Sequence, residues 1–195
     1  MEAYESFVAL AMETEGLVVS EAVKFPVKRQ TKKTSHKEVQ THGFEVDLVG
    51  ARVDKLVLAT VKSFFGSQGV KAAEVTGTAA ANTGLYALLN NPVVQDQVLA
   101  RACQRYGYQA SQVEFRLYVG RFAAAKTNGH EPLIREWCAK QMAGGGPIKV
   151  FDAREVALVA RSLAESKTYR DNPALVAMKV LAEAEMLTPL PSSGA

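Results

Sequence analysis

The stretch HGFEVDLVGARVDKLVLATVKSFFGS, residues 42–67, decides the fold class. In FEVDLVG, charged and apolar side chains alternate, which is typical of a β-strand with one covered face. KLVLATVKSFF is a second run of the same kind. Because only the short link ARVDK separates the two runs, the sequence predicts an antiparallel hairpin.

Helical and strand patterns alternate along the rest of the chain. Helices are predicted at 3–15, about 81–106 (one helix or a pair, with Pro92 in a first turn), 131–142, 153–165 after Asp152 as N-cap, and 173–187. Further strands are predicted at 18–27, 112–122 and, for about four residues, after GGGP at 144–147. This order predicts an α/β domain with a mixed β-sheet flanked by helices.

Length and composition limit the class of protein. A chain of 195 residues is long enough for one domain with a core. We expect a core over 1–150, a helical extension of the same domain over 151–187 and a disordered tail over 188–195. The start of the chain lacks a basic and then apolar leader, and no run is long enough to span a membrane, so we expect a cytoplasmic protein without a membrane partner. The two cysteines, which form no CxxC motif, indicate neither a disulfide framework nor a zinc site.

Charged side chains follow both strands of the predicted hairpin. Glu45 and Asp47 share one strand face, and Thr60 and Lys62 share a face of the next strand. The hairpin can bring Asp47 near Lys62. An aspartate beside a lysine in a cleft can hold a divalent cation and orient a water against a phosphodiester. The alternative is an ordinary cross-strand ion pair on a solvated face.

With an acid late on one strand and a lysine late on the next, the chain resembles the PD-(D/E)XK, or restriction-endonuclease-like, nuclease superfamily over about residues 3–122. The resemblance implies an αβββαβ core with extra C-terminal helices. It also implies a metal-dependent endonuclease site in which Asp47 and Lys62 are catalytic and Glu15, or Glu13, assists from the first helix.

The chain departs from the family pattern two residues before the lysine, where Thr60 replaces the family's carboxylate. A hydroxyl is a poorer ligand for Mg²⁺ than a carboxylate. One reading is that Glu45 substitutes as a catalytic acid, so that Asp47 and Glu45 hold Mg²⁺. The other reading is a degenerate site in a protein that binds nucleic acid without cutting it.

The positive charge of the chain is local. Residues 24–42 hold six Lys or Arg against one Glu, a net charge of +5, whereas the whole chain is +3 and the remainder is therefore −2. Such a segment beside a cleft can neutralise phosphates. A solvated loop whose lysines prevent edge pairing is the alternative. The candidate nucleic-acid-binding residues are Lys28, Arg29, Lys32, Lys33 and Lys37.

These patterns predict a nucleic-acid-binding protein with duplex DNA as the expected partner. The alternative is a non-enzymatic protein–protein adaptor or inhibitor on the same scaffold, and the last two helices leave a homodimer open. A basic segment that lines the cleft favours nucleic acid. A basic segment that points into solvent, with an apolar patch elsewhere, favours a protein partner.

Overall fold

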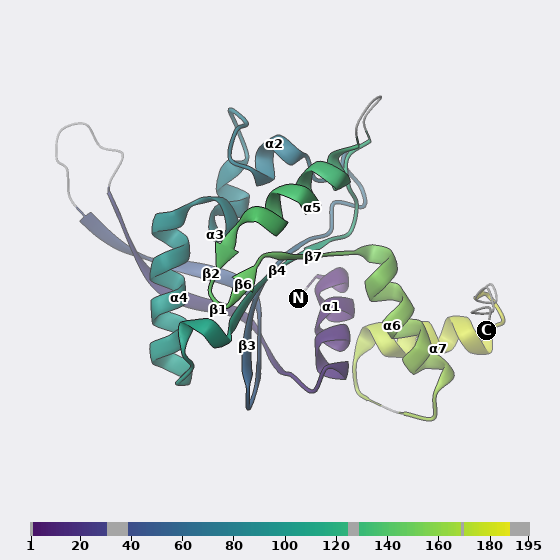
Figure 1. The fold of residues 1–195 in the computed structure, drawn as a ribbon. Coiled ribbons are helices and arrows are strands. Elements are labelled where there is room, and N and C mark those ends of the chain that lie inside the picture. The colour runs from purple at the N-terminus through teal and green to yellow at the C-terminus, as the bar shows by residue number, and fades with distance from the viewer. Residues whose placement is uncertain (1, 31–38, 125–128, 169, 188–195) are drawn as a thin grey trace.

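A five-stranded mixed sheet forms the centre of the protein in the computed structural model, which describes residues 2–30, 39–124, 129–168 and 170–187 (Figure 1). The strand order is β1-β2-β3-β4-β7. Neighbours are antiparallel from β1 to β3 and parallel from β3 to β7. The strands are β1 (Val18–Gln30), β2 (Val39–Arg52), β3 (Lys55–Lys62), β4 (Val113–Val119) and β7 (Lys149–Asp152). The predicted α/β class with a mixed, helix-flanked sheet is confirmed.

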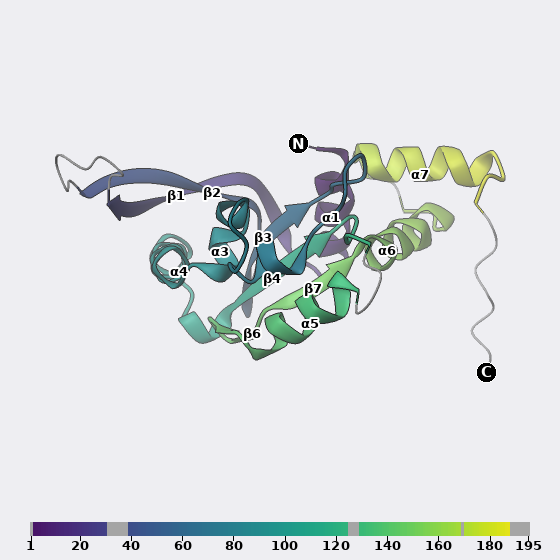
Figure 2. The same cartoon turned by 90° about the horizontal axis from the view of Figure 1, so that it is seen from above.

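Helices cover both faces of this sheet, so the molecule has three layers (Figure 2). α1, α6 and α7 gather on one side, and α2 to α5 lie on the other. The helices are α1 (Ala3–Thr14), α2 (Ala72–Val75), α3 (Ala87–Asn90), α4 (Pro92–Tyr106), α5 (His130–Lys140), α6 (Ala153–Glu165) and α7 (Pro173–Glu183). Short 3-10 turns at Thr83–Tyr86 and Ala110–Gln112, and a small ribbon of β5 (Met142–Ala143) and β6 (Gly146–Pro147), complete the described elements.

The central strand β3 shows why its sequence is apolar throughout. Leu56 and Leu58 pack in the core under α4 and α5, whereas Val57, Ala59 and Val61 pack under α1 and α6. A strand covered on both faces has no solvated side, which explains its near-continuous apolar run. A separate, smaller core joins α1 to α6 and α7 through Leu10, Ala160, Ala164, Leu175 and Met178.

The β1–β2 hairpin is longer than the sequence predicted and reaches out past α4 (Figures 1 and 2). Its ladder runs from Val18 opposite Ala51 to Gln30 opposite Val39. Pro26 lies inside β1. A proline, which has no N–H to donate, is tolerated in a strand at the edge of a sheet, and β1 is an edge strand.

Several predicted boundaries agree with the structure. α6 covers the predicted 153–165, and the Asp152 side chain accepts a hydrogen bond from the Glu155 N–H in a capping box. α7 ends at Glu183, four residues before its predicted end. The tail 188–195, predicted to be disordered, lies outside the described residues. No described helix has the length and apolar character that crossing a membrane requires.

Candidate functional site

A cleft opens where β2 separates from β3. The two strands pair from Arg52 opposite Lys55 only as far as Leu48 opposite Ala59, while β3 stays paired with β4 up to Lys62. Asp47 lies at the point of separation. Its carboxylate Oδ2 accepts a hydrogen bond of 2.7 Å from the Val61 N–H. The Asp47 side chain thus accepts the hydrogen bond of the Val61 N–H at a point where the backbone of β2 is no longer paired with β3.

A twist in the hairpin accompanies this separation. Val46 packs in the core on the α4 side and Leu48 in the core on the α1 side, although residues two apart along a regular strand share a face. The β1–β2 ladder pairs Glu21 with Leu48 and Val23 with Val46 but does not pair Ala22 with Asp47, and Ala22 has a φ of 49°. A left-handed φ at a non-glycine residue marks a local distortion of the chain. The distortion therefore lies at a gap in the β1–β2 ladder, and the candidate acid Asp47 is in that gap.

Asp47 and Lys62 are in direct contact, as the hairpin pattern predicted. Lys62 Nζ lies 3.2 Å from Asp47 Oδ2, and both side chains are about four-fifths buried. Thr60, two residues before Lys62, is 5% exposed. The structure therefore brings Asp47 and Lys62 together, whereas Thr60 is buried and does not line the cleft.

The cleft is a hollow of about 610 Å³ between β3, the start of α1 and the loop after β3. Asp47 and Lys62 line it together with Glu2 and Glu5 from α1. Glu2 Oε2 accepts a hydrogen bond from the Ser63 hydroxyl, which ties α1 to the end of β3. Glu2 and Glu5 form the capping box of α1. Sequence reasoning missed both acids, because the pattern of a helix does not reveal which end faces the sheet.

Glu45, the proposed substitute acid, lies beside Asp47. Both line a second hollow of about 300 Å³ next to the cleft, together with Glu2, Glu5 and Glu21. Glu45 is half exposed and pairs with Lys24 at 3.6 Å. This hollow is rich in carboxylates, but its acids come from three separate segments.

The donor set does not fit a Mg²⁺ ion as it lies. Mg²⁺ needs oxygen ligands at about 2.0–2.1 Å in octahedral geometry. The described residues include no group of three or more His, Cys, Asp or Glu side chains close enough to hold a metal ion. Asp47 Oδ2 already accepts two hydrogen bonds, and Glu45 is paired with a lysine. We therefore derive no reaction step through a metal.

Glu15, the helix acid carried over from the family resemblance, is not part of the cleft. It caps the far end of α1, about 20 Å along the helix axis from Glu2. Its two carboxylate oxygens accept hydrogen bonds of 2.6 and 2.7 Å from the Arg116 guanidinium. Glu13, the alternative, pairs with Arg170. The structure thus gives Glu15 a partner inside the fold rather than a place beside Asp47.

Arg116 is the centre of a buried charge cluster. It is 1% exposed, and besides Glu15 it contacts Glu114 and the Tyr118 hydroxyl. Burial alone would raise the pKa of Glu15, but the hydrogen bonds and charge of Arg116 hold that pKa below its ordinary value. Burial raises the pKa of Tyr118 to about 12. These shifts describe a structural ion cluster under α1.

A second candidate surface runs along β1 and α4, far from the cleft. Gln97 of α4 binds the backbone of Lys28 through both ends of its amide: Oε1 accepts from the Lys28 N–H at 2.7 Å, and Nε2 donates to the Lys28 carbonyl at 3.2 Å. Two turns along, the Arg105 guanidinium donates to the Lys24 carbonyl. α4 therefore lies along the free edge of β1 and satisfies part of its backbone.

Five cations border the seam between β1 and α4, which we call the basic edge. Arg29 shares the face of β1 that packs on α4, whereas Lys24 and Lys28 point to the other face, where Lys24 pairs with Glu45. Arg29 lies 5.5 Å from the centre of the Phe44 ring, and Arg105 lies over Phe25 and Tyr106. All five are exposed. Asp96 of α4 is an exposed acid of the same helix. The basic edge consists of Lys24, Lys28 and Arg29 from β1 and Arg101 and Arg105 from α4.

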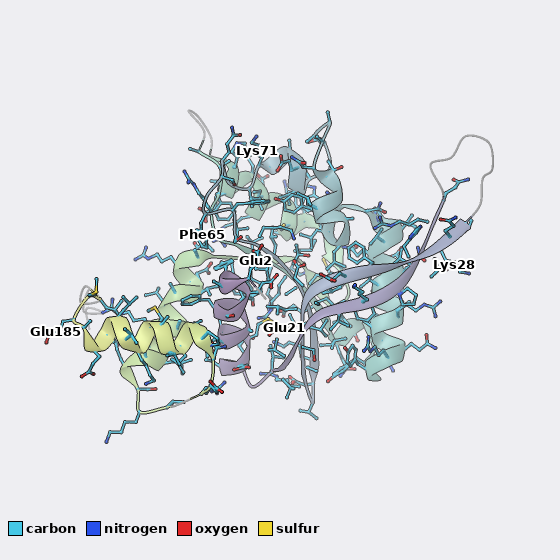
Figure 3. The ribbon with its side chains drawn as sticks, turned by 180° about the vertical axis from the view of Figure 1, so that it is seen from behind. Glu2, Glu21, Lys28, Phe65, Lys71 and Glu185 are labelled. Carbon is cyan, nitrogen blue, oxygen red and sulfur yellow. The ribbon has the colours of Figure 1, made fainter. Side chains whose placement is uncertain are left out.

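Two of the five predicted nucleic-acid-binding residues, Lys28 and Arg29, are thus placed on the basic edge. The other three, Lys32, Lys33 and Lys37, lie outside the described residues. The sequence did not identify Arg101 and Arg105, because only the packing of α4 on β1 brings them to the same surface. Figure 3 shows Lys28 toward the end of the hairpin, well away from Glu2 and Phe65 at the cleft. The described part of the basic segment therefore does not line the cleft, contrary to the expectation for a nucleic-acid site.

Comparison with known proteins adds no relative. No family model matches the chain, and neither the curated proteins nor the solved structures include a significant match.

Proposed function

We propose that this protein binds nucleic acid, with duplex DNA as the expected partner, and that it does so through the basic edge. The single observation behind the proposal is the alignment of α4 with β1, which brings five exposed cations to one edge of the sheet, on both of its faces. The lysines at 32, 33 and 37 follow the same strand in the sequence and extend its charge. Phosphate neutralisation by such side chains supplies most of the affinity in sequence-independent DNA binding.

The length of the basic edge suits a nucleic-acid backbone. Lys24 and Lys28 are four residues apart on β1, about 13 Å at the usual strand rise. Gln97 and Arg105 are eight residues apart on α4, about 12 Å at the usual helical rise. One strand of a duplex presents a phosphate about every 3.4 Å of axis, so this length matches about four phosphates.

Two of the cations are held in place before any ligand binds. The guanidinium carbons of Arg29 and Arg105 lie 5.5 and 5.4 Å from the centres of the Phe44 and Tyr106 rings, and Arg105 also donates to a backbone carbonyl. Guanidiniums that already contact an aromatic ring lose less side-chain entropy when they meet a phosphate than free side chains do. The basic edge is therefore partly preorganised.

The cleft argues against cleavage. The αβββαβ order of elements and the contact between Asp47 and Lys62 support the resemblance to the PD-(D/E)XK superfamily. In contrast, Thr60 is buried in place of an acid, and the nearby carboxylates are not gathered around one point. We therefore propose a degenerate phosphodiesterase site. Mg²⁺ binding by Asp47 and Glu45 stays a prediction, which a cleavage assay with added metal tests.

The test measures how much of a fluorescent DNA duplex the protein retains at low salt. The duplex is about two helical turns of B-DNA long, roughly 20 bp. We expect Lys28→Gln combined with Arg101→Gln to weaken binding by about tenfold or more, because two phosphate contacts are lost. Lys140→Gln is the matched control, since Lys140 is an exposed lysine on α5 away from the basic edge. Equal binding by the double variant and the control would contradict the proposal.

A further inference from the structure

The side of α1 that faces α6 carries an apolar hollow. It has a volume of about 610 Å³ and is lined chiefly by Tyr4 and Phe7 of α1, Phe65 of the loop after β3, and Val156 and Ala157 of α6. Phe65 is 54% exposed, although it is a large apolar side chain. An exposed aromatic ring beside an apolar hollow is typical of a binding surface rather than of plain packing.

The hollow continues into the acidic cleft. Glu2, Ser63 and Phe65 line both, so the two meet at the start of α1. Figure 3 shows Glu2 and Phe65 close together there. We call the combined surface the α1 groove. One part of it is apolar, and the other part is lined by polar and charged side chains.

Charge in the α1 groove is negative. Of the charged side chains that line it, Glu2, Glu5 and Asp47 are acids, and Lys62 is the cation. The adjoining hollow adds Glu21 and Glu45. A phosphate backbone would be repelled here. A cationic ligand would be attracted.

We propose that the α1 groove binds a basic segment of a partner protein, in which apolar side chains alternate with Lys or Arg. Apolar side chains of the segment fill the hollow against Tyr4, Phe65 and Val156. Its Lys or Arg side chains meet the carboxylates of Glu2 and Glu5. The site goes beyond the proposed nucleic-acid binding, because it uses a different surface with the opposite charge.

The wall of the groove is held by the fold. The Phe65 ring packs edge-on against Tyr4, with ring centres 5.3 Å apart. Hydrogen bonds fix the loop that carries it: the Gly120 N–H donates to the Lys62 carbonyl, and the Arg121 guanidinium donates to the Phe65 carbonyl. A binding surface that is already formed loses less entropy on association.

The experiment uses fluorescein-labelled synthetic peptides and the full chain, with binding followed by fluorescence anisotropy. The first peptide alternates leucine and lysine, one control replaces lysine by glutamate, and the other replaces leucine by serine. We expect both controls to bind about tenfold more weakly, since each loses one of the two kinds of contact. Equal binding of the glutamate control would overturn the proposal.

Variants locate the site. Ala157→Arg places a cation and a long side chain in the apolar hollow, and we expect it to weaken binding of the leucine–lysine peptide by about tenfold. Ala177→Arg is the matched control, because Ala177 is an exposed helical alanine on α7. Phe65→Ala removes a wall of the groove and should weaken binding in the same way. If Ala157→Arg and Phe65→Ala both bind as the wild type does, the α1 groove is not the site.

The two proposals fail separately. The Lys28→Gln, Arg101→Gln double variant should bind the peptide normally even if it no longer retains DNA. If the wild type binds the peptide but does not bind DNA, the proposal for the α1 groove stands and the proposal for the basic edge is refuted. If a duplex competes with the peptide for the α1 groove, the groove binds nucleic acid and the inference is wrong.

Discussion

Removing the charge of Glu15 should destabilise the fold, although this residue resembles an ordinary surface glutamate in the sequence. Arg116 is 1% exposed, and Glu15 binds it through two charge-assisted hydrogen bonds. A hydrogen bond to a charged group contributes about 1.5–3 kcal/mol, and breaking a buried ion pair costs more because one charge is left without its partner. Glu15 itself is 36% exposed and Arg116 keeps Glu114, so we take about 2 kcal/mol for Glu15→Gln.

Urea unfolding measures this loss. With a slope of about 2 kcal/mol per M, a loss of about 2 kcal/mol lowers the urea midpoint by about 1 M. Glu13→Gln is the matched control on the same helix. Its partner Arg170 is 39% exposed, so the control should cost about 0–1 kcal/mol. Equal midpoints for the two variants would refute the argument from the burial of Arg116.

The same pair makes stability depend on pH. Arg116 holds the pKa of Glu15 below that of the unfolded chain, against the effect of burial. Between the folded and the unfolded pKa of Glu15, the folded state therefore binds fewer protons than the unfolded state. The stabilisation is complete above the unfolded pKa and disappears as the pH falls through the folded pKa. In Glu15→Gln, the loss of stability toward acid should be smaller than in the wild type.

Other predictions concern the loop, the edge strand and the cleft. Gly120→Ala should lower the free energy of unfolding by about 1–3 kcal/mol, because its Cβ would overlap the Ser63 carbonyl. Gly84→Ala has open space around its Cβ and should be neutral or stabilising by up to about 1 kcal/mol. Thermal unfolding measures both changes. Gln97→Ala should cost about 1 kcal/mol and speed hydrogen exchange at the Lys28 amide, which loses its acceptor; unchanged exchange there would contradict the role of Gln97. Supercoiled DNA with Mg²⁺ or Mn²⁺ should stay intact, and nicking that disappears in Asp47→Ala would show instead that the cleft is a working nuclease site.

Local patterns predicted much of the fold. The antiparallel β2–β3 hairpin could be recognised because two apolar runs flank a very short link, and the structure has only Val53 and Asp54 between the strands. The start of α6 could be recognised because Asp152 and Glu155 form a capping box three residues apart. In both cases the decisive contacts lie within a few residues of sequence.

The parts that the sequence did not predict depend on contacts between distant residues. Arg101 and Arg105 lie near β1 only because α4 packs along that strand. The helical period showed α1 itself, but not which of its ends meets the β2–β3 separation. Glu2 was therefore missed and Glu15 was placed in the wrong neighbourhood.

The salt dependence of DNA binding tests the central claim most directly. For B-DNA, each neutralised phosphate contributes about −0.9 to the slope of log K against log salt concentration. If the basic edge binds the backbone, the slope should be steep in the wild type and shallower by about 2 in the Lys28→Gln, Arg101→Gln double variant. An unchanged slope in that variant, or no retention of DNA by the wild type at low salt, would contradict the claim that this surface binds nucleic acid.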